Sequence, residues 1–198
     1  TLITDNTWKA SFGPIRISDI YNGEIYDARE ELAGWDTPGY NDRNWSGTLR
    51  HSYPKENLVA PDDPPVRKVK TIEPQNIIYT PQGDTVFDMG QNMVGWIRLN
   101  IMGEEGETLK LKHAEVLDKE GNLYTKNLRQ ADQCVQYTFK GKSQEEEYEP
   151  HFTFQGFRYV AIEGLDRKPS KHMLTGVVVH SDMEPTGDFE CSNPLVNQ

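Results

Sequence analysis

Residues 88–127, DMGQNMVGWIRLNIMGEEGETLKLKHAEVLDKEGNLYTKN, decide the fold class, because their apolar residues recur at every second position. Ile97, Leu99 and Ile101 alternate with Trp96 and polar residues, and Leu109 and Leu111 alternate with lysines. A period of two is typical of a strand with one buried face, and GEEGE and DKEGN supply the turn residues of hairpins. The stretch therefore predicts antiparallel strands joined by tight turns.

The beginning of this stretch, residues 88–96, contains two glycines, Gly90 and Gly95, without the spacing of a phosphate-binding loop. We interpret it as a strand, a tight turn in which Asn92 takes a positive φ, and a second strand anchored by Trp96. Downstream, YEPHFTFQGFRYVAIEGL predicts a long strand interrupted by a bulge at Gln155–Gly156, and LTGVVVHSD predicts a central strand. We therefore predict that residues 66–185 form an antiparallel β-sandwich.

The organisation of the remaining chain follows from its prolines and turn residues. APDDPPV predicts an extended Pro-rich linker over residues 61–65. Residues 1–60 are turn-rich with short β-like pieces, and we interpret them as the C-terminal part of a second β-sandwich. In residues 186–198, CSNPLVNQ combines N-cap residues with a proline and predicts the start of a helix. We expect the sequence to be an excised part of a longer chain.

Composition limits the partners. The chain has 198 residues, 31 acidic against 21 basic, and a net charge of −10, which disfavours nucleic acid and anionic lipid. Its apolar runs are strand-sized, so no membrane span is predicted. Cys134 and Cys191 have no metal-ligand spacing. The compartment is left open by the sequence.

Two groups of residues between positions 113 and 149 suggest catalysis. His113 and Glu115 form an HxE pair, but His113 continues the apolar face of its strand, which favours a buried, hydrogen-bonded histidine over a metal ligand or base. Glu145, Glu147 and Glu149 share one strand face, as the acid and nucleophile of a sandwich glycosidase would. This glycosidase hypothesis requires a raised pKa on one carboxyl group, and the alternative is a solvated edge.

Residues 19–45 suggest carbohydrate binding instead. Asp19, Asn22, Glu24 and Asp27 offer oxygen ligands suited to Ca²⁺. Trp35 and Trp45, together with two tyrosines, offer flat faces to a sugar. The alternative is that SDIYNGE is a plain turn and the aromatic residues are core anchors.

Several ordered motifs together resemble one family. SDIYNGEIYDARE, GWDTPGYNDRNW, APDDPPVR, FDMGQNMVGWIRLNIMGEEGETLKLKHAEVL and EPHFTFQGFRYVAIEG are similar to the N-terminal β region of bacterial α-L-rhamnosidases of glycoside hydrolase family 78. The resemblance implies a jelly-roll-like domain that ends near residue 60 and a concanavalin-like sandwich over residues 66–185. It implies that residues 186–198 lead into a catalytic (α/α)₆ barrel.

The family's inverting general acid and base lie on that barrel and match no position of this sequence. The resemblance therefore implies a non-catalytic fragment that supports the hydrolysis of terminal α-L-rhamnosides by the parent enzyme. We expect it to pack against the barrel, and such an interface would explain apolar surface at Met89, Met93 and Trp96 if these side chains are exposed. The alternative is a Ca²⁺-dependent module that binds L-rhamnose-containing glycans through residues 19–45. No cofactor is required in the first case, and Ca²⁺ is expected in the second.

Overall fold

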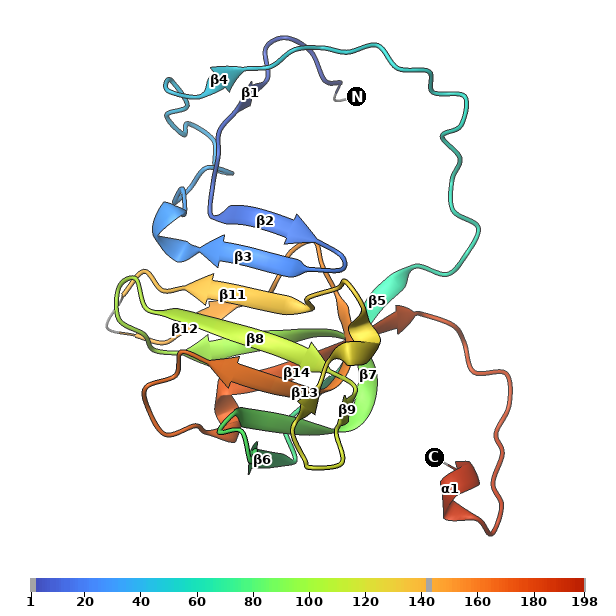
Figure 1. Ribbon diagram of the computed structural model, residues 1–198. Coiled ribbons are helices and arrows are strands. Elements are labelled where there is room, and N and C mark those ends of the chain that lie inside the picture. Colours follow the sequence, from blue (N-terminus) through green and yellow to red (C-terminus); the bar gives the residue numbers. More distant parts are fainter. Residues whose placement is uncertain (1–2, 142–143, 198) are drawn as a thin grey trace.

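The computed structural model describes residues 3–141 and 144–197, and they form a curled β-sheet with two extended arms (Figure 1). The strands are β1 Lys9–Ala10, β2 Ile15–Asp19, β3 Gly23–Asp27, β4 Ser46–Gly47, β5 Val66–Ile72, β6 Asn76–Tyr79, β7 Thr85–Ile101, β8 Thr108–Ala114, β9 Val116–Leu117, β10 Leu123–Tyr124, β11 Cys134–Thr138, β12 Glu146–Tyr148, β13 Gln155–Glu163 and β14 Leu174–Ser181. The helical turns are η1 Ala28–Glu30, η2 Lys126–Leu128, η3 Lys171–Met173 and α1 Pro194–Asn197. The all-β prediction is confirmed.

Ten strands belong to one sheet. Its order is β2-β3-β11-β8-β13-β7-β14-β5, and β6 and β12 also pair with β7. Among the described residues the pairs are antiparallel except β3–β11, which is parallel. Two strands from the first 60 residues thus continue the sheet made by later residues. Strands from both sides of the predicted boundary at residues 60–66 therefore belong to the same sheet.

The long strand β7 makes the sheet curl into two layers. Its first half pairs with β6 and β13, whereas its second half pairs with β12 and β14. Gly90 and Gly95 both have positive φ, +83° and +153°, inside this strand. A bent strand can serve both layers of a sandwich because glycine tolerates such backbone angles.

Two local predictions for these strands are wrong in their details. The turn expected at Asn92 is a bend within continuous β7, and the positive φ angles fall on glycines. The irregularity expected at Gln155–Gly156 lies instead between Phe157 and Tyr159, because β13 begins at Gln155 and its register with β7 shifts later. Both predictions place a backbone irregularity at least one residue away from its position in the structure.

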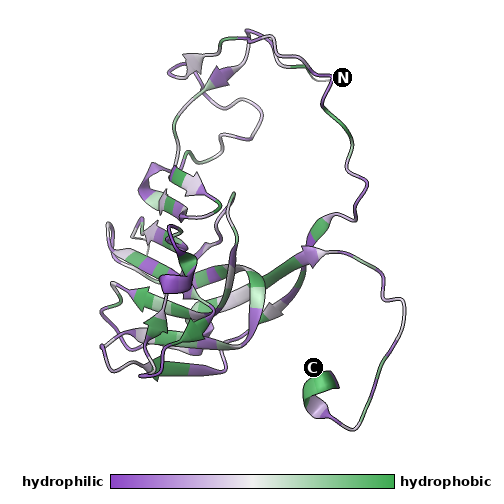
Figure 2. Ribbon diagram, turned by 45° about the vertical axis from the view of Figure 1, so that its right-hand side comes forward, coloured by the Kyte–Doolittle hydropathy of each residue, from purple (hydrophilic) through white to green (hydrophobic). Residues whose placement is uncertain are grey.

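The core lies between the two layers of the curled sheet. Its largest fully buried side chains come from strands of both layers and include Phe87, Leu99, Leu109, Tyr137 and Phe157. Figure 2 shows the hydrophobic residues concentrated in these strands. Burial of such apolar side chains is the main stabilising term of the fold.

The arms lie outside this core. The short β1–β4 pair is apart from the curled sheet, and residues 48–65, including the predicted linker, run exposed back to β5 (Figure 1). The helix predicted near the C-terminus is present as the single turn α1. Among the described residues, no helix has the length and apolar character needed to cross a membrane.

Candidate ligand-binding site

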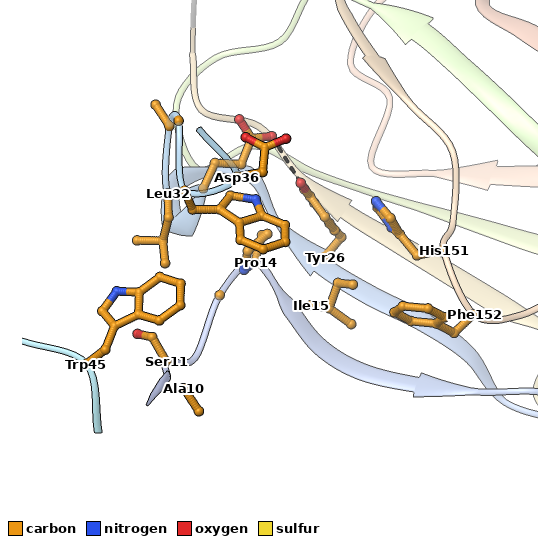
Figure 3. Close-up of a pocket in the computed structure, with 15 residues that line it drawn as sticks. Ala10, Ser11, Pro14, Ile15, Tyr26, Leu32, Asp36, Trp45, His151 and Phe152 are labelled. Atoms are coloured by element: carbon orange, nitrogen blue, oxygen red, sulfur yellow. Dashed lines mark hydrogen bonds between the residues drawn. The ribbon is translucent and has the colours of Figure 1, made fainter. Parts of the chain in front are cut away.

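An aromatic hollow of about 660 Å³ opens beside the β2–β3 hairpin (Figure 3). Three parts of the chain line it: residues 10–15, residues 26–45 and the pair His151–Phe152. Trp35, Trp45 and Tyr26 supply its other aromatic surfaces. Residues more than 100 positions apart in the sequence therefore meet at one site.

The β2–β3 hairpin is shaped by its turn. The Asp19 carboxylate accepts hydrogen bonds from the backbone N–H groups of Tyr21 and Asn22, both at 2.8 Å. Gly23 follows with φ +105°, and a Cβ at this position would overlap the backbone of Cys134 on β11. The hairpin can thus lie close against β11, which orients Glu24 and Tyr26.

Glu24 is a fully buried carboxylate that anchors one wall of the hollow. It accepts hydrogen bonds from the Tyr148 hydroxyl at 2.8 Å, the Ser18 hydroxyl at 3.1 Å and the His151 backbone N–H at 3.0 Å. His151 Nδ1 lies 3.0 Å from the same carboxylate, and the Phe152 N–H lies 3.4 Å away. Burial and the Glu24 charge raise the pKa of Tyr148, so its hydroxyl stays a donor.

Tyr26 forms the floor. Its ring stacks on His151 with centroids 5.4 Å apart and an interplanar angle of 6°. Its hydroxyl donates to Glu31 at 3.2 Å, and Lys140 Nζ lies 2.5 Å from the other oxygen of Glu31. Burial and the Glu31 charge raise the pKa of Tyr26. Glu31 thus presents acceptor oxygens to the hollow from a fixed position.

A neighbouring hollow of about 440 Å³ contains Glu149. Lys68 Nζ, Trp96 Nε1 and Arg98 Nε each lie 2.7 Å from its carboxylate. Partial burial acts to raise the pKa of Glu149, but these donors outweigh burial and lower it to about 2. The raised pKa that the glycosidase hypothesis requires is therefore contradicted at Glu149. A carboxylate held this way is a structural anchor for its loop.

The predicted calcium ligands do not line the aromatic hollow. Asp19 caps its turn, Glu24 is enclosed, and Asp27 forms two hydrogen bonds with Arg29 at 2.9 and 2.7 Å, which lower the pKa of Asp27. In residues 3–141 and 144–197, no group of three or more His, Cys, Asp or Glu is placed to hold a metal ion. Of the predicted ligand-binding residues, the hollow contains Trp35 and Trp45. Calcium binding stays a prediction.

Other predicted residues have structural positions. His113 is fully buried, its Nδ1 lies 2.9 Å from the Gln133 carbonyl, and burial lowers its pKa to about 4, which confirms the buried, hydrogen-bonded histidine. The condition set for an interface patch at Met89 and Met93 is not met, because both side chains pack in the core, and Trp96 is half-buried.

Sequence reasoning missed Glu31, His151 and Phe152 as lining residues. Their one local signal is the aromatic run HFTF, residues 151–154, which alternation assigned to a strand face. The segment is instead a loop before β13, and Phe152 and Phe154 are exposed. The aromatic run could be recognised as part of the hollow only once the β2–β3 hairpin was seen to lie beside it.

The chain matches two family models. Residues 78–180 match the bacterial α-L-rhamnosidase concanavalin-like domain, and residues 1–70 match the α-L-rhamnosidase N-terminal domain. An α-L-rhamnosidase of Streptomyces avermitilis is 45% identical over 193 residues, which cover 96% of this chain and 18% of the relative. One from Formosa agariphila is 38% identical over 201 residues, which cover 100% of this chain and 22% of the relative. The chain thus spans about a fifth of the length of these relatives.

Solved structures give the same result. The α-L-rhamnosidase of Aspergillus terreus has a TM-score of 0.92 and 45% identity, over 99% of this chain and 23% of that one. The Streptomyces avermitilis enzyme, solved with L-rhamnose, has a TM-score of 0.91 and 44% identity, over 98% and 19%. Both the curled sheet and the segments around the hollow therefore have counterparts in solved structures.

Proposed function

Because the chain belongs to the family of bacterial α-L-rhamnosidase concanavalin-like domains, we propose that it supports the hydrolysis of terminal α-L-rhamnosides by an inverting (α/α)₆ barrel elsewhere in a parent polypeptide. The observation that carries this proposal is the match over 96–100% of the chain to only about a fifth of each relative. In this role the chain is a scaffold, and its partner is the catalytic domain of the parent.

The carboxylates of the chain support a scaffold role. Inverting hydrolysis needs an acid and a base placed roughly 6.5–9.5 Å apart across a bound sugar. Glu24 and Glu149 lie near the two hollows, and both already accept hydrogen bonds from several internal donors. Carboxylates engaged in this way stabilise loops and are poorly placed to exchange protons with a substrate.

A domain exchange tests the scaffold role. In the Streptomyces avermitilis relative, the matching region is either deleted or replaced by this chain, and turnover of an aryl α-L-rhamnoside is measured. We expect the deletion to lose soluble activity and the exchange to restore it. An exchange that carries Leu99→Asp, which places a charge in the core, is the matched control and should fail. Full activity of the deletion would overturn the proposal.

The second candidate is the Ca²⁺-dependent L-rhamnose-binding module. The observation in its favour is the aromatic hollow, since Trp35 and Trp45 lie where a sugar could stack. Calorimetric titration of the chain with L-rhamnose, with and without Ca²⁺, tests it. Heat that depends on Ca²⁺ would support this candidate. Equal heats in both buffers would refute the metal requirement.

A further inference from the structure

We propose that one surface of the curled sheet, centred on Gly156 of β13, docks the catalytic domain of the parent polypeptide. This Gly156 surface has an apolar centre and a polar rim, formed by Val94, Phe154 and Gly156 and by Asn92, Glu115 and Asn127. The inference rests on the proposed scaffold function, which supplies the partner, and it adds the place of contact.

The apolar centre is exposed on two paired strands. Val94 of β7 pairs with Gly156 of β13, so the two residues share one face of the sheet. The side chain of Val94 is 47% exposed, and that of Phe154, two positions before Gly156, is 50% exposed. A Cβ added at Gly156 would meet, among the described residues, the Glu115 carboxylate at 3.8 Å and nothing closer. A glycine between two exposed apolar side chains leaves room for a side chain of a partner.

The polar rim is held in place by hydrogen bonds. The Glu115 carboxylate accepts one from Asn92 Nδ2 at 3.3 Å and another from Asn127 Nδ2 at 3.1 Å. These bonds join β7, the β8–β9 connection and η2. Because both amides use their NH₂ groups internally, their oxygens face outward as acceptors. An apolar centre inside a polar rim is typical of protein interfaces, and groups that are ordered before docking lose little entropy.

Two cations flank the rim on η2 and after it. Lys126 and Arg129 are exposed, and neither forms an ion pair within residues 3–141 and 144–197. Arg129 takes φ +59°, which is uncommon for a residue other than glycine, and the Ala131 N–H holds this turn by donating to the Leu128 carbonyl at 3.0 Å. Unpaired cations at fixed positions on a chain of net charge −10 favour a partner face with acidic groups.

The C-terminal arm begins beside this surface. The last pair between β14 and β7 is Val178–Gly95, next to Val94, and β14 ends three residues later at Ser181. Figure 1 places β9, η2, the bend of β7 and the end of β14 on the same side of the sheet. About four fifths of each relative lies outside the part that this chain matches. A domain joined through the arm is tethered close to the surface, which favours it over a second copy of the chain.

Hydrogen exchange in two proteins tests the docking. One is the 198-residue chain, and the other is the Streptomyces avermitilis relative in which this chain replaces the matching region. We expect the backbone amides of residues 92–95 and 154–156 to exchange about tenfold more slowly in the exchange protein. Met102, at the opposite end of β7, is exposed to a similar extent, 51%, and the amides beside it should exchange equally in both proteins.

Gly156→Leu is the decisive variant. The φ of Gly156 lies outside the left-handed region and the nearest atom leaves ordinary contact distance, so the 198-residue chain should keep its midpoint of urea unfolding. In the exchange protein the added side chain should block docking and abolish the extra protection. Gly47→Leu is the matched control, because a Cβ there has open space on a different arm of the chain.

A second pair of variants removes apolar surface in place of adding bulk. Phe154→Ala should weaken the protection in the exchange protein, whereas Met102→Ala, at the other end of β7, should leave it intact. Protection that persists in both Gly156→Leu and Phe154→Ala would place the contact elsewhere and overturn the inference.

The remaining outcomes separate this inference from the scaffold role. An active exchange protein without added protection would refute docking at the Gly156 surface and leave the scaffold role standing. Full activity of the deletion would remove the scaffold role and this inference with it. Self-association of the 198-residue chain in sedimentation, abolished by Gly156→Leu, would assign the surface to a second copy and also overturn the inference.

Discussion

His113 should make the chain lose stability in mild acid. The side chain is fully buried on β8, meets Phe157 edge-on at 4.7 Å, and burial lowers its pKa from 6.5 to about 4. Between these two values the unfolded chain binds a proton that the folded chain does not. The free energy of unfolding therefore falls as the pH drops below 6.5, and this contribution levels off below about 4.

The magnitude follows from the size of the shift. Each pH unit between the two pKa values is worth about 1.4 kcal/mol, so the loss from this histidine is about 2 kcal/mol at pH 5 and roughly 3 kcal/mol below pH 4. Urea unfolding at pH 7.5 and pH 5 measures it. Other groups also titrate in this range, so the quantity of interest is the difference between the wild type and a variant without His113.

His113→Phe is the suitable variant. The Gln133 carbonyl keeps the His113 backbone N–H as a donor at 3.1 Å, and Nε2 has no hydrogen-bond partner within the described residues, so the change leaves no new unpaired group. The variant should lose about 2 kcal/mol less than the wild type between pH 7.5 and 5. His172→Gln, at an exposed histidine, is the control. Equal acid sensitivity of wild type and His113→Phe would refute the reasoning.

Two further variants test the frame that holds the hollow. Gly95→Ala would put a Cβ into the Val177 carbonyl and should break the β7–β14 pairing, with a loss of roughly 3 kcal/mol or more in urea unfolding, whereas Gly47→Ala, which has open space, should change little. Glu24→Gln would replace an acceptor oxygen by an NH₂ group among hydrogen-bond donors and should cost roughly 2–4 kcal/mol, whereas exposed Glu147→Gln should be neutral. A Glu24→Gln chain as stable as the wild type would show that the buried carboxylate does not anchor its loop.

The strands could be predicted because alternation is a local property. Leu109 and Leu111 on β8, and Val135 and Tyr137 on β11, are buried as their period of two indicates. The curl of β7 was not predicted, because it depends on which of several glycines meets a neighbouring backbone. Only the assembled sheet shows that Gly95 pairs with Val178 on β14 and lies against the Val177 carbonyl.

Only part of the hollow could be predicted, because its other residues are brought together by the assembled fold. Trp35 and Trp45 stand out in the sequence as aromatic residues in a turn-rich segment, and both line the hollow. The roles of the carboxylates could not be predicted, because the sequence does not show which groups donate hydrogen bonds to a given acidic side chain. Glu24 is taken up by Tyr148 and His151, which lie more than 120 residues away. The calcium hypothesis counted these oxygens before their partners were known.

The loop before β13 couples the two ends of the chain. Glu149 fixes its first residue to Lys68 on β5 and Arg98 on β7, while Glu24 on β3 holds His151 two positions later. The N-terminal hairpin and the later strands thus share one short segment. Because His151 also stacks on the hollow's floor, a change that loosens either carboxylate should disturb the hollow before the core unfolds. The stability of the aromatic hollow is therefore coupled to that of the concanavalin-like sheet through this loop.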